Sequence, residues 1–228
     1  MSLREDAKKI YLSSIAKLDP SRTVYDYLSS NSVVKSHFEK IYPVAFGKAS
    51  ISMMSGLLNY LNDQFPKIPI HEKPIVISNN SQENIEHTVD LNFSSHPIPT
   101  EKSVAAGDKV INYISSSSDK DLVIFLISGG ASALLSKPPS SIALKDKITL
   151  TDLLLKSGAS INEMNTVRKH MSDIKGGRLT KFAEPSPCYS LIISDVINDD
   201  ISSIASGPTT HDKTTYKDAE NILNSYNL

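Results

Sequence analysis

The chain has 228 residues, of which 39% are hydrophobic and 21% charged, and its formal net charge is −1. This composition is typical of a soluble globular protein with an aliphatic core, and the near-neutral charge argues against a nucleic-acid-binding surface. The single cysteine, Cys188, excludes an internal disulfide framework. The longest apolar run, 122–127, is far shorter than the roughly 20 residues that span a bilayer. We therefore expect a cytoplasmic protein without a membrane segment.

Strand-like and helix-like patterns alternate along the first half of the chain. Ser2 and Glu5 form a capping box that predicts an N-terminal helix, which we expect to end near Asp19-Pro20. The apolar run 41–46 predicts a buried strand that breaks at Gly47 into a helix over about 50–61. Shorter strands are predicted over 74–78 and 89–93. Thr100 is the expected cap of a helix that runs to about Ile114.

The second half begins with the clearest strand, 122–127, whose continuous apolar run is typical of a strand covered on both faces. A helix is predicted around 147–156, ending at Gly158. Ser160 and Glu163 form another capping box. The helix that it begins has an apolar stripe at spacings of three and four, through Ile161, Met164, Val167, Met171 and Ile174. A last buried strand over 190–193 and a tail helix over 215–228 complete the pattern.

This alternation predicts an α/β fold with a mainly parallel, Rossmann-like sheet and helices on both faces. In such sheets ligands bind beyond the carboxyl ends of the strands. Three polar loops fall at predicted strand ends, namely Gly47-Lys48, Ser128–Ser132 and Ser194–Asp200. Their coincidence at one edge favours a ligand site there.

The first two loops have the chemistry of anion sites. Gly47-Lys48 follows a strand and opens a helix, a geometry that favours a phosphate or carboxylate. It is not a Walker A loop, because Tyr42 stands where the upstream glycine is expected. In Ser128-Gly129-Gly130-Ala131-Ser132, two glycines let backbone amides approach a phosphate and two hydroxyls can donate to it. The alternative for both loops is an ordinary turn that needs glycine for packing.

The densest group of donors lies in the stretch NTVRKHMSDIKGG, which runs from Asn165 to Gly177. We expect its cationic and amide side chains, together with exposed backbone amides at its paired glycines, to bind an anion. The residues concerned are Asn165, Arg168, Lys169, Lys175, Gly176 and Gly177. The alternative is a solvated helix face that ends at an ordinary glycine stop. His170, beside the apolar stripe, is expected to be packed rather than catalytic.

Asp195 follows the last predicted strand and precedes Asp199-Asp200. A carboxylate at this position can hold Mg²⁺ against phosphate groups, and it can alternatively cap a turn. Cys188 has no His-containing motif nearby and is expected to be inert.

Five blocks of the sequence resemble the N-terminal domain of the glycerate 2-kinases, the family related to MOFRL-domain proteins. They are VAFGKAS (44–50), HPIPTEKSVAAG (96–107), FLISGGASALL (125–135), NTVRKHMSDIKGGRL (165–179) and SDVINDDISSIASGPT (194–209). The blocks occur in family order and cover most of the chain. The resemblance implies transfer of the γ-phosphoryl group of ATP, with Mg²⁺, to the 2-hydroxyl of D-glycerate, which gives 2-phosphoglycerate.

The resemblance also implies roles for individual residues. Lys48 is expected to bind the glycerate carboxylate or the transferring phosphoryl group, and the 128–132 loop to cradle phosphate. Arg168, with Lys169 or Lys175, would neutralise charge that develops on the phosphoryl oxygens. Asp195 would anchor Mg²⁺. Family members carry a further C-terminal, MOFRL-type domain that faces this one across a cleft, so we expect residues 1–228 to be the N-terminal glycerate kinase domain and to be inactive alone.

Three other functions remain open. Some relatives of this family are labelled hydroxypyruvate reductases, but the dinucleotide fingerprint G-x-G-x-x-G is absent. A non-catalytic anion-sensing module and a sugar-phosphate isomerase would use similar strand-end loops. The sequence leaves open the phosphoryl donor, the hydroxyl that is phosphorylated, the general base and homo-oligomerisation.

Overall fold

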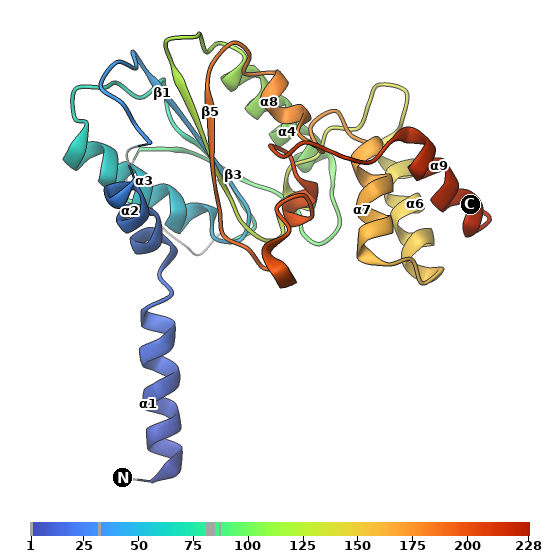
Figure 1. Cartoon of the computed structure of the whole chain (residues 1–228), viewed down its shortest axis with the longest axis horizontal. Helices are drawn as coiled ribbons and strands as arrows, with labels where there is room; N and C mark the ends of the chain where they lie inside the picture. The colour runs from blue at the N-terminus through green and yellow to red at the C-terminus, as the bar shows by residue number, and fades with distance from the viewer. Residues whose placement is uncertain (1, 32, 81–84, 87) are drawn as a thin grey trace.

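The computed structural model describes residues 2–31, 33–80, 85–86 and 88–228, which contain one five-stranded sheet (Figure 1). The strands are β1 (Ile41–Phe46), β2 (Ile75–Ser78), β3 (Asp90–Phe93), β4 (Leu122–Ile127) and β5 (Cys188–Ile192). Every neighbouring pair is parallel, and the order is β3-β2-β1-β4-β5. The strand order reverses between β1 and β4, which is where open α/β sheets bind their ligands.

Helices cover both faces of this sheet (Figure 1), which confirms the predicted fold class. The α-helices are α1 (Leu3–Ala16), α2 (Pro20–Ser30), α3 (Ser50–Gln64), α4 (Glu101–Ile114), α5 (Ala131–Leu134), α6 (Leu144–Lys156), α7 (Ile161–His170), α8 (Arg178–Lys181) and α9 (Tyr216–Ser225). Two 3₁₀ turns, η1 (Ile197–Asp199) and η2 (Ile204–Ser206), follow β5.

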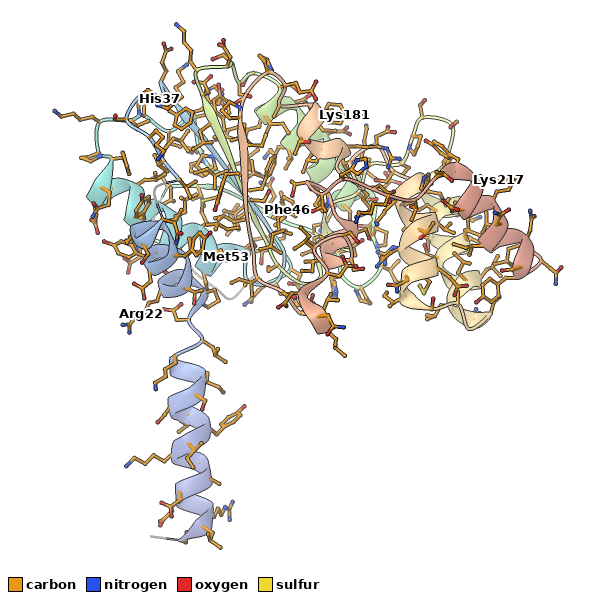
Figure 2. All side chains as sticks on the ribbon, viewed as in Figure 1. Arg22, His37, Phe46, Met53, Lys181 and Lys217 are labelled. Carbon is orange, nitrogen blue, oxygen red and sulfur yellow. The ribbon has the colours of Figure 1, made fainter. Side chains whose placement is uncertain are left out.

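The core lies in two layers because side chains alternate along each strand. Ile41 and Ala45 of β1 face α2 and α3, whereas Val44 and Phe46 face α4. Figure 2 shows Phe46 and, on α3, Met53 inside the body of the molecule, where both are buried. β1 and β4 are buried along their whole length, as their continuous apolar runs predict.

A small helical layer of α6, α7 and α9 lies beside the sheet (Figure 1). Its apolar centre contains Leu154, Met164, Val167 and Ala219, which include two members of the predicted stripe. Helix α7 ends at His170, so the stripe does not continue in helical form. Met171 is the C-cap, and Ile174 lies beyond it in the main core.

Helix α1 extends away from the rest of the molecule (Figures 1 and 2). Its capping box forms as predicted, through hydrogen bonds between Ser2 and Glu5. Large apolar side chains along it are exposed, namely Leu3, Ile10, Tyr11, Leu12 and Ile15. Among the described helices, none is both long enough and apolar enough to cross a membrane.

Three observed helices, α2, α5 and α8, are not predicted from the sequence. The Asp19-Pro20 pair does not only end α1 but also begins α2, because the Asp19 carboxylate accepts a hydrogen bond from the amide of Ser21 and proline suits the first helical position. The other two, α5 and α8, are single turns. The last strand also begins two residues earlier than predicted, at Cys188, where it pairs with Val123.

Candidate functional site

The turns after β1 and β4 meet at the point where the strand order reverses. The amide of Ala49 donates a hydrogen bond to Oγ of Ser128 at 3.0 Å, and the amide of Lys48 donates to the carbonyl of Gly129 at 2.9 Å. Gly47 adopts φ +129°, and a Cβ at this position would collide with Ser128. Glycine is therefore required for the two turns to come this close.

The turn at Gly129-Gly130 is surrounded by three titratable side chains from separate segments. A Cβ on Gly129 would collide with the Asp195 carboxylate, and one on Gly130 would lie 3.0 Å from the His96 ring and 3.2 Å from Cε of Lys48. Among the described residues, no protein group accepts a hydrogen bond from the amides of the two glycines. The turn therefore presents two open donors beside a lysine, a histidine and a carboxylate.

His96 is the residue of this group that the sequence analysis did not select. It follows β3, and its ring is half-buried. Burial lowers the pKa of the ring, and the nearby charge of Lys48 lowers it further, whereas Asp195 acts in the opposite direction. The ring is consequently neutral at pH 7, since the ordinary pKa of histidine is about 6.5. One signal in the sequence could have identified His96, namely its place at the start of the block HPIPTEKSVAAG.

Arg168 and Asn165 join a second group of polar residues around Ser132. The Arg168 guanidinium donates to Oγ of Ser132 at 2.6 Å. Ser132 and Ser206 share a hydrogen bond of 2.9 Å between their hydroxyls, and Ser206 donates to Oδ1 of Asn165 at 3.1 Å. This network links α5, α7 and η2, so the alternative of a solvated face on α7 does not hold. Asn165 is in fact 5% exposed.

A hollow of about 460 Å³ opens over this network. One part of its wall is formed by Ser132, Asn165, Arg168 and Ser206, and the segment between β5 and η2 forms a further part. That segment contributes Val196, Ile197, Asn198, Asp200 and Ser203. Because Asp195 immediately precedes Val196, the hollow lies next to the Gly129-Gly130 turn.

Lys175 is buried beneath this wall rather than exposed in the hollow. Its side chain is fully buried, and its ammonium donates to the carbonyls of Ser132 at 3.0 Å and of Ala205 at 3.2 Å. Burial lowers the pKa of Lys175 well below the ordinary value, and the charges of Lys147 and Arg168 add to the effect. Lys175 therefore ties α5 to η2.

Lys169 is engaged by a buried carboxylate. Its ammonium donates to Asp212 at 3.4 Å, and both side chains are 7% exposed. Burial acts to raise the pKa of Asp212, but hydrogen bonds from Thr214 and the charges of Lys169 and His170 outweigh it, so the pKa lies below its usual value. His170 is packed, as predicted, with its ring against Tyr216.

The backbone amides of the paired glycines Gly176 and Gly177 are hydrogen-bonded within the protein. The amide of Gly176 donates to the carbonyl of Ser206 at 3.1 Å, and that of Gly177 to the carbonyl of Gly207 at 2.7 Å. The expectation of exposed amides at these two positions is therefore wrong, because backbone carbonyls of a neighbouring segment accept the hydrogen bonds that we expected a ligand to accept. Cys188 is half-buried on β5, and burial raises the pKa of its thiol to about 11, in keeping with an inert residue.

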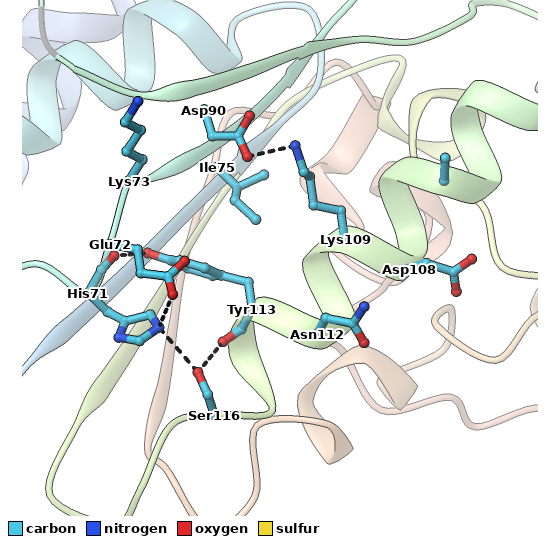
Figure 3. A pocket seen from close by; sticks show the side chains of 11 residues that line it. His71, Glu72, Lys73, Ile75, Asp90, Asp108, Lys109, Asn112, Tyr113 and Ser116 are labelled. Carbon is cyan, nitrogen blue, oxygen red and sulfur yellow. Dashed lines mark hydrogen bonds and ion pairs between the residues drawn. The ribbon is translucent and has the colours of Figure 1, made fainter.

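A larger hollow, of about 1070 Å³, lies at the opposite ends of the strands (Figure 3). It is lined by Ile75 and Asp90, the first residues of β2 and β3, and by α4. The Lys109 ammonium in this hollow is paired with Asp90 at 2.6 Å. The hollow lies at the edge of the sheet that parallel folds do not use for ligands, and its pair of charges is already satisfied. We therefore place the candidate site at the other edge.

Within the described part of the chain, no group of three or more His, Cys, Asp or Glu side chains is arranged to hold a metal ion. Asp195 stands singly beside the open amides. One or two carboxylates suffice for Mg²⁺ where phosphate oxygens complete its coordination. The donor set therefore fits Mg²⁺ that arrives with a nucleotide, and it does not fit a permanent metal centre.

Comparison with known proteins gives a consistent result. Residues 6–228 match the family described as "Domain of unknown function (DUF4147)". The chain is 36% identical to the glycerate 2-kinase of Pyrococcus horikoshii, over all of this chain and 51% of that protein. It is 37% identical to a protein of Agrobacterium vitis that bears the name of a hydroxypyruvate reductase, over all of this chain and 50% of that protein.

A solved structure shows the same architecture. The crystal structure of glycerate kinase from Thermotoga maritima superimposes with a TM-score of 0.86 at 32% identity, over 99% of this chain and 52% of that one. The chain thus spans about half the length of the curated relatives it matches. The resemblance to the glycerate 2-kinases is confirmed, and the chain belongs to the DUF4147 family.

Proposed function

We propose that this chain provides one wall of the active site of an ATP-dependent glycerate 2-kinase, which phosphorylates the 2-hydroxyl of D-glycerate. The observation that carries the proposal is the cluster of Lys48, His96 and Asp195 around the open amides of Gly129 and Gly130. It lies where the strand order reverses, and the relatives that share the fold include glycerate kinases.

Both substrates of this reaction are anionic, and the site supplies charge to match. The exposed ammonium of Lys48 can bind the glycerate carboxylate or the transferring phosphoryl group. The amides of Gly129 and Gly130 can donate to phosphate oxygens. Such fixed donors need no reorganisation as charge develops, so they favour the transition state over the ground state.

Phosphoryl transfer requires little covalent chemistry of the protein beyond positioning and neutralisation of charge. Asp195 would hold Mg²⁺, which neutralises charge on the nucleotide phosphates when bound. His96 can accept the proton of the 2-hydroxyl, because its lowered pKa leaves the ring neutral at pH 7. Arg168, held by Ser132, would face the phosphate groups from the adjoining hollow.

Residues Lys169, Lys175, Gly176 and Gly177 would act indirectly in this mechanism. Their polar groups are engaged by other parts of the chain, so they would hold the wall of the site rather than contact the ligand. We further propose that the half of the relatives to which this chain does not align supplies the opposite wall of the cleft.

A coupled assay on the full-length protein tests the function. With D-glycerate, ATP and Mg²⁺, enolase alone converts 2-phosphoglycerate to a product that absorbs in the ultraviolet. We expect a signal that does not require added phosphoglycerate mutase. A signal only with the mutase would mean transfer to the 3-hydroxyl, and no signal with either would contradict the kinase.

Two alternatives have their own readouts. Oxidation of a reduced nicotinamide cofactor by hydroxypyruvate would support the reductase, as the name of the Agrobacterium vitis relative suggests. The turn after β1 has the sequence Gly47-Lys48-Ala49-Ser50 and lacks the glycine pattern that a dinucleotide requires, so we expect none. Calorimetric binding of nucleotide without turnover would instead favour a non-catalytic module.

A further inference from the structure

Three basic side chains gather in and behind the wall of the hollow over Ser132. Lys147 of α6 and Lys175 are 4% and 2% exposed, and Arg168 of α7 lines the hollow itself. The charges of Lys147 and Arg168 both act on Lys175, and that of Arg168 acts on Lys147. We call these three residues the cationic cluster. The sequence analysis did not assign Lys147 to any site.

The charge of Asp173 acts on Lys147, but the described residues show no ion pair between the two side chains. Among the residues that the structure describes, none of its three members forms an ion pair with a carboxylate. Lys147 donates to Oγ of Ser136 at 3.2 Å, and Lys175 donates to two carbonyls. Burying a cation without an opposite charge is costly, so an apolar side chain in the place of Lys147 would serve the fold better.

We propose that the cationic cluster is the charged base of a phosphate-binding subsite in this hollow, and that Lys147 is a positioning residue that acts on the bound phosphate through Arg168. The source of the phosphate, a nucleotide or the phosphorylated product, rests on the proposed function, whereas the existence of the subsite does not.

The wall of the hollow has the donors that a phosphate group requires. Arg168 presents a guanidinium, whose planar set of N–H groups matches phosphate oxygens. Asn165 lies in the same wall, and its Nδ2 has no acceptor among the described residues, whereas the hydroxyls of Ser132 and Ser206 are bonded to each other and that of Ser206 also to Asn165. A phosphate bound there would receive hydrogen bonds from this wall and place a negative charge beside Arg168, with which neither lysine of the cluster competes by an ion pair of its own among the described residues.

Sulfate is a suitable probe because its charge does not change between pH 7 and pH 9. Over this range Lys147 loses its proton, since burial and the charge of Arg168 lower its pKa to about 8. The charged groups that face Lys147 are Arg168, Asp173 and Lys175. Asp200, which also lines the hollow, has a pKa lowered by hydrogen bonds from Ser203 and Ser202, so it stays charged throughout.

The experiment is calorimetric titration of the protein with sulfate at pH 7 and pH 9, for wild type and three variants. We expect wild-type affinity to fall about tenfold between the two pH values, which is the effect of losing one nearby charge in a partly screened site. Lys147→Met should bind about tenfold more weakly at pH 7 and show no further decrease at pH 9. Lys147→Arg should keep wild-type affinity at both.

Lys145→Met is the matched control, because Lys145 is exposed on the same helix two residues away. It should behave as the wild type does. Equal sulfate affinity for wild type and folded Lys147→Met, or wild-type affinity that does not change between pH 7 and pH 9, would overturn the proposal. The pH series on the wild type provides a test even if Lys147→Met does not fold.

Two further titrations identify the source of the phosphate and separate this proposal from the proposed function. ADP and 2-phosphoglycerate are titrated into wild type and Lys147→Met, and the one whose binding weakens is the ligand of the subsite. Sulfate binding that depends on Lys147 in a protein without kinase activity would retain the subsite and reject the kinase. Normal kinase activity together with sulfate binding that is unchanged in Lys147→Met would retain the kinase and reject the subsite.

Discussion

The edge of the sheet at β1 and β4 and the segment from α7 to α8 carry similar residues and use them differently. Both combine lysine with paired glycines. At the sheet edge Lys48 is exposed, and the described residues offer no acceptor to the amides of Gly129 and Gly130. Along the second segment Lys175 is bonded to two carbonyls, and the amides of Gly176 and Gly177 donate to neighbouring carbonyls.

This difference teaches that residue type does not distinguish a binding loop from a structural one. A donor can serve a ligand only where the fold has left it without a partner. The sheet edge is therefore expected to govern turnover, whereas Lys169, Lys175 and the two glycines of the second segment are expected to govern stability. Four substitutions can break or sharpen this division.

The largest effect is expected for Asp212→Ala, which leaves the ammonium of Lys169 buried without its partner. The free energy of unfolding should fall by about 3–5 kcal/mol, measured by urea denaturation. The double variant Lys169→Met/Asp212→Ala should recover more than half of the loss, since neither charge remains. A loss below about 1 kcal/mol in the single variant would show that this pair is not structural.

Lys48→Ala should have the opposite profile. We expect kcat/KM of the full-length enzyme to fall about 10²-fold or more, as when a charge-stabilising donor is removed. The free energy of unfolding should stay within about 0.5 kcal/mol of wild type, because the side chain is exposed. Lys102→Ala, at an exposed position of α4, is the control and should leave both unchanged. Near-normal kinetics for Lys48→Ala would remove Lys48 from the site.

Gly47→Ala tests how closely the two strand-end turns must approach. It places a Cβ against Ser128 at φ +129°, and we expect a loss of about 2 kcal/mol in stability together with reduced kcat/KM. Gly158→Ala is the matched variant, with φ +79° but open space around its Cβ, and should cost about 1 kcal/mol without a kinetic effect. Identical results for the two would mean that backbone strain alone matters at Gly47.

His96→Asn is expected to have the smallest effect. If neutral His96 accepts the hydroxyl proton, kcat/KM should rise with pH through an apparent pKa below 6.5, the direction that burial and Lys48 impose. The variant should lose this acid limb and about tenfold in rate, because phosphoryl transfer depends little on proton transfer. An unchanged pH profile in the variant would assign the limb to another group.

Much of the sheet edge could be predicted from the sequence, because local patterns determine it. The apolar runs that form β1 and β4 end at glycines, and parallel strands bring such ends together. Gly47, Lys48 and the Ser128–Ser132 loop could therefore be placed without a structure. The position of Asp195 at this edge could be predicted in the same way, because Asp195 comes shortly after the end of β5.

The remaining assignments depend on contacts between distant parts of the chain. Asp212 pairs with Lys169 across 43 residues, and no local pattern relates them. His96 reaches the site because β3 lies parallel to the other strands, whereas its sequence context suggested only a strand end. Lys147 lies at the start of a predicted helix without a pattern that marks it as buried, and tertiary packing buries it.

The parallel pairing of β1 with β4 has a consequence for biosynthesis. Residues 41–46 leave the ribosome well before residues 122–127, with which they align. Until then β1 can pair only with β2, and one edge of its apolar backbone stays open to other chains. Long-range pairing of this kind slows folding and exposes intermediates to aggregation. The strand junction that brings Lys48 to the Gly129-Gly130 turn is thus also a step before which the nascent chain is exposed to aggregation.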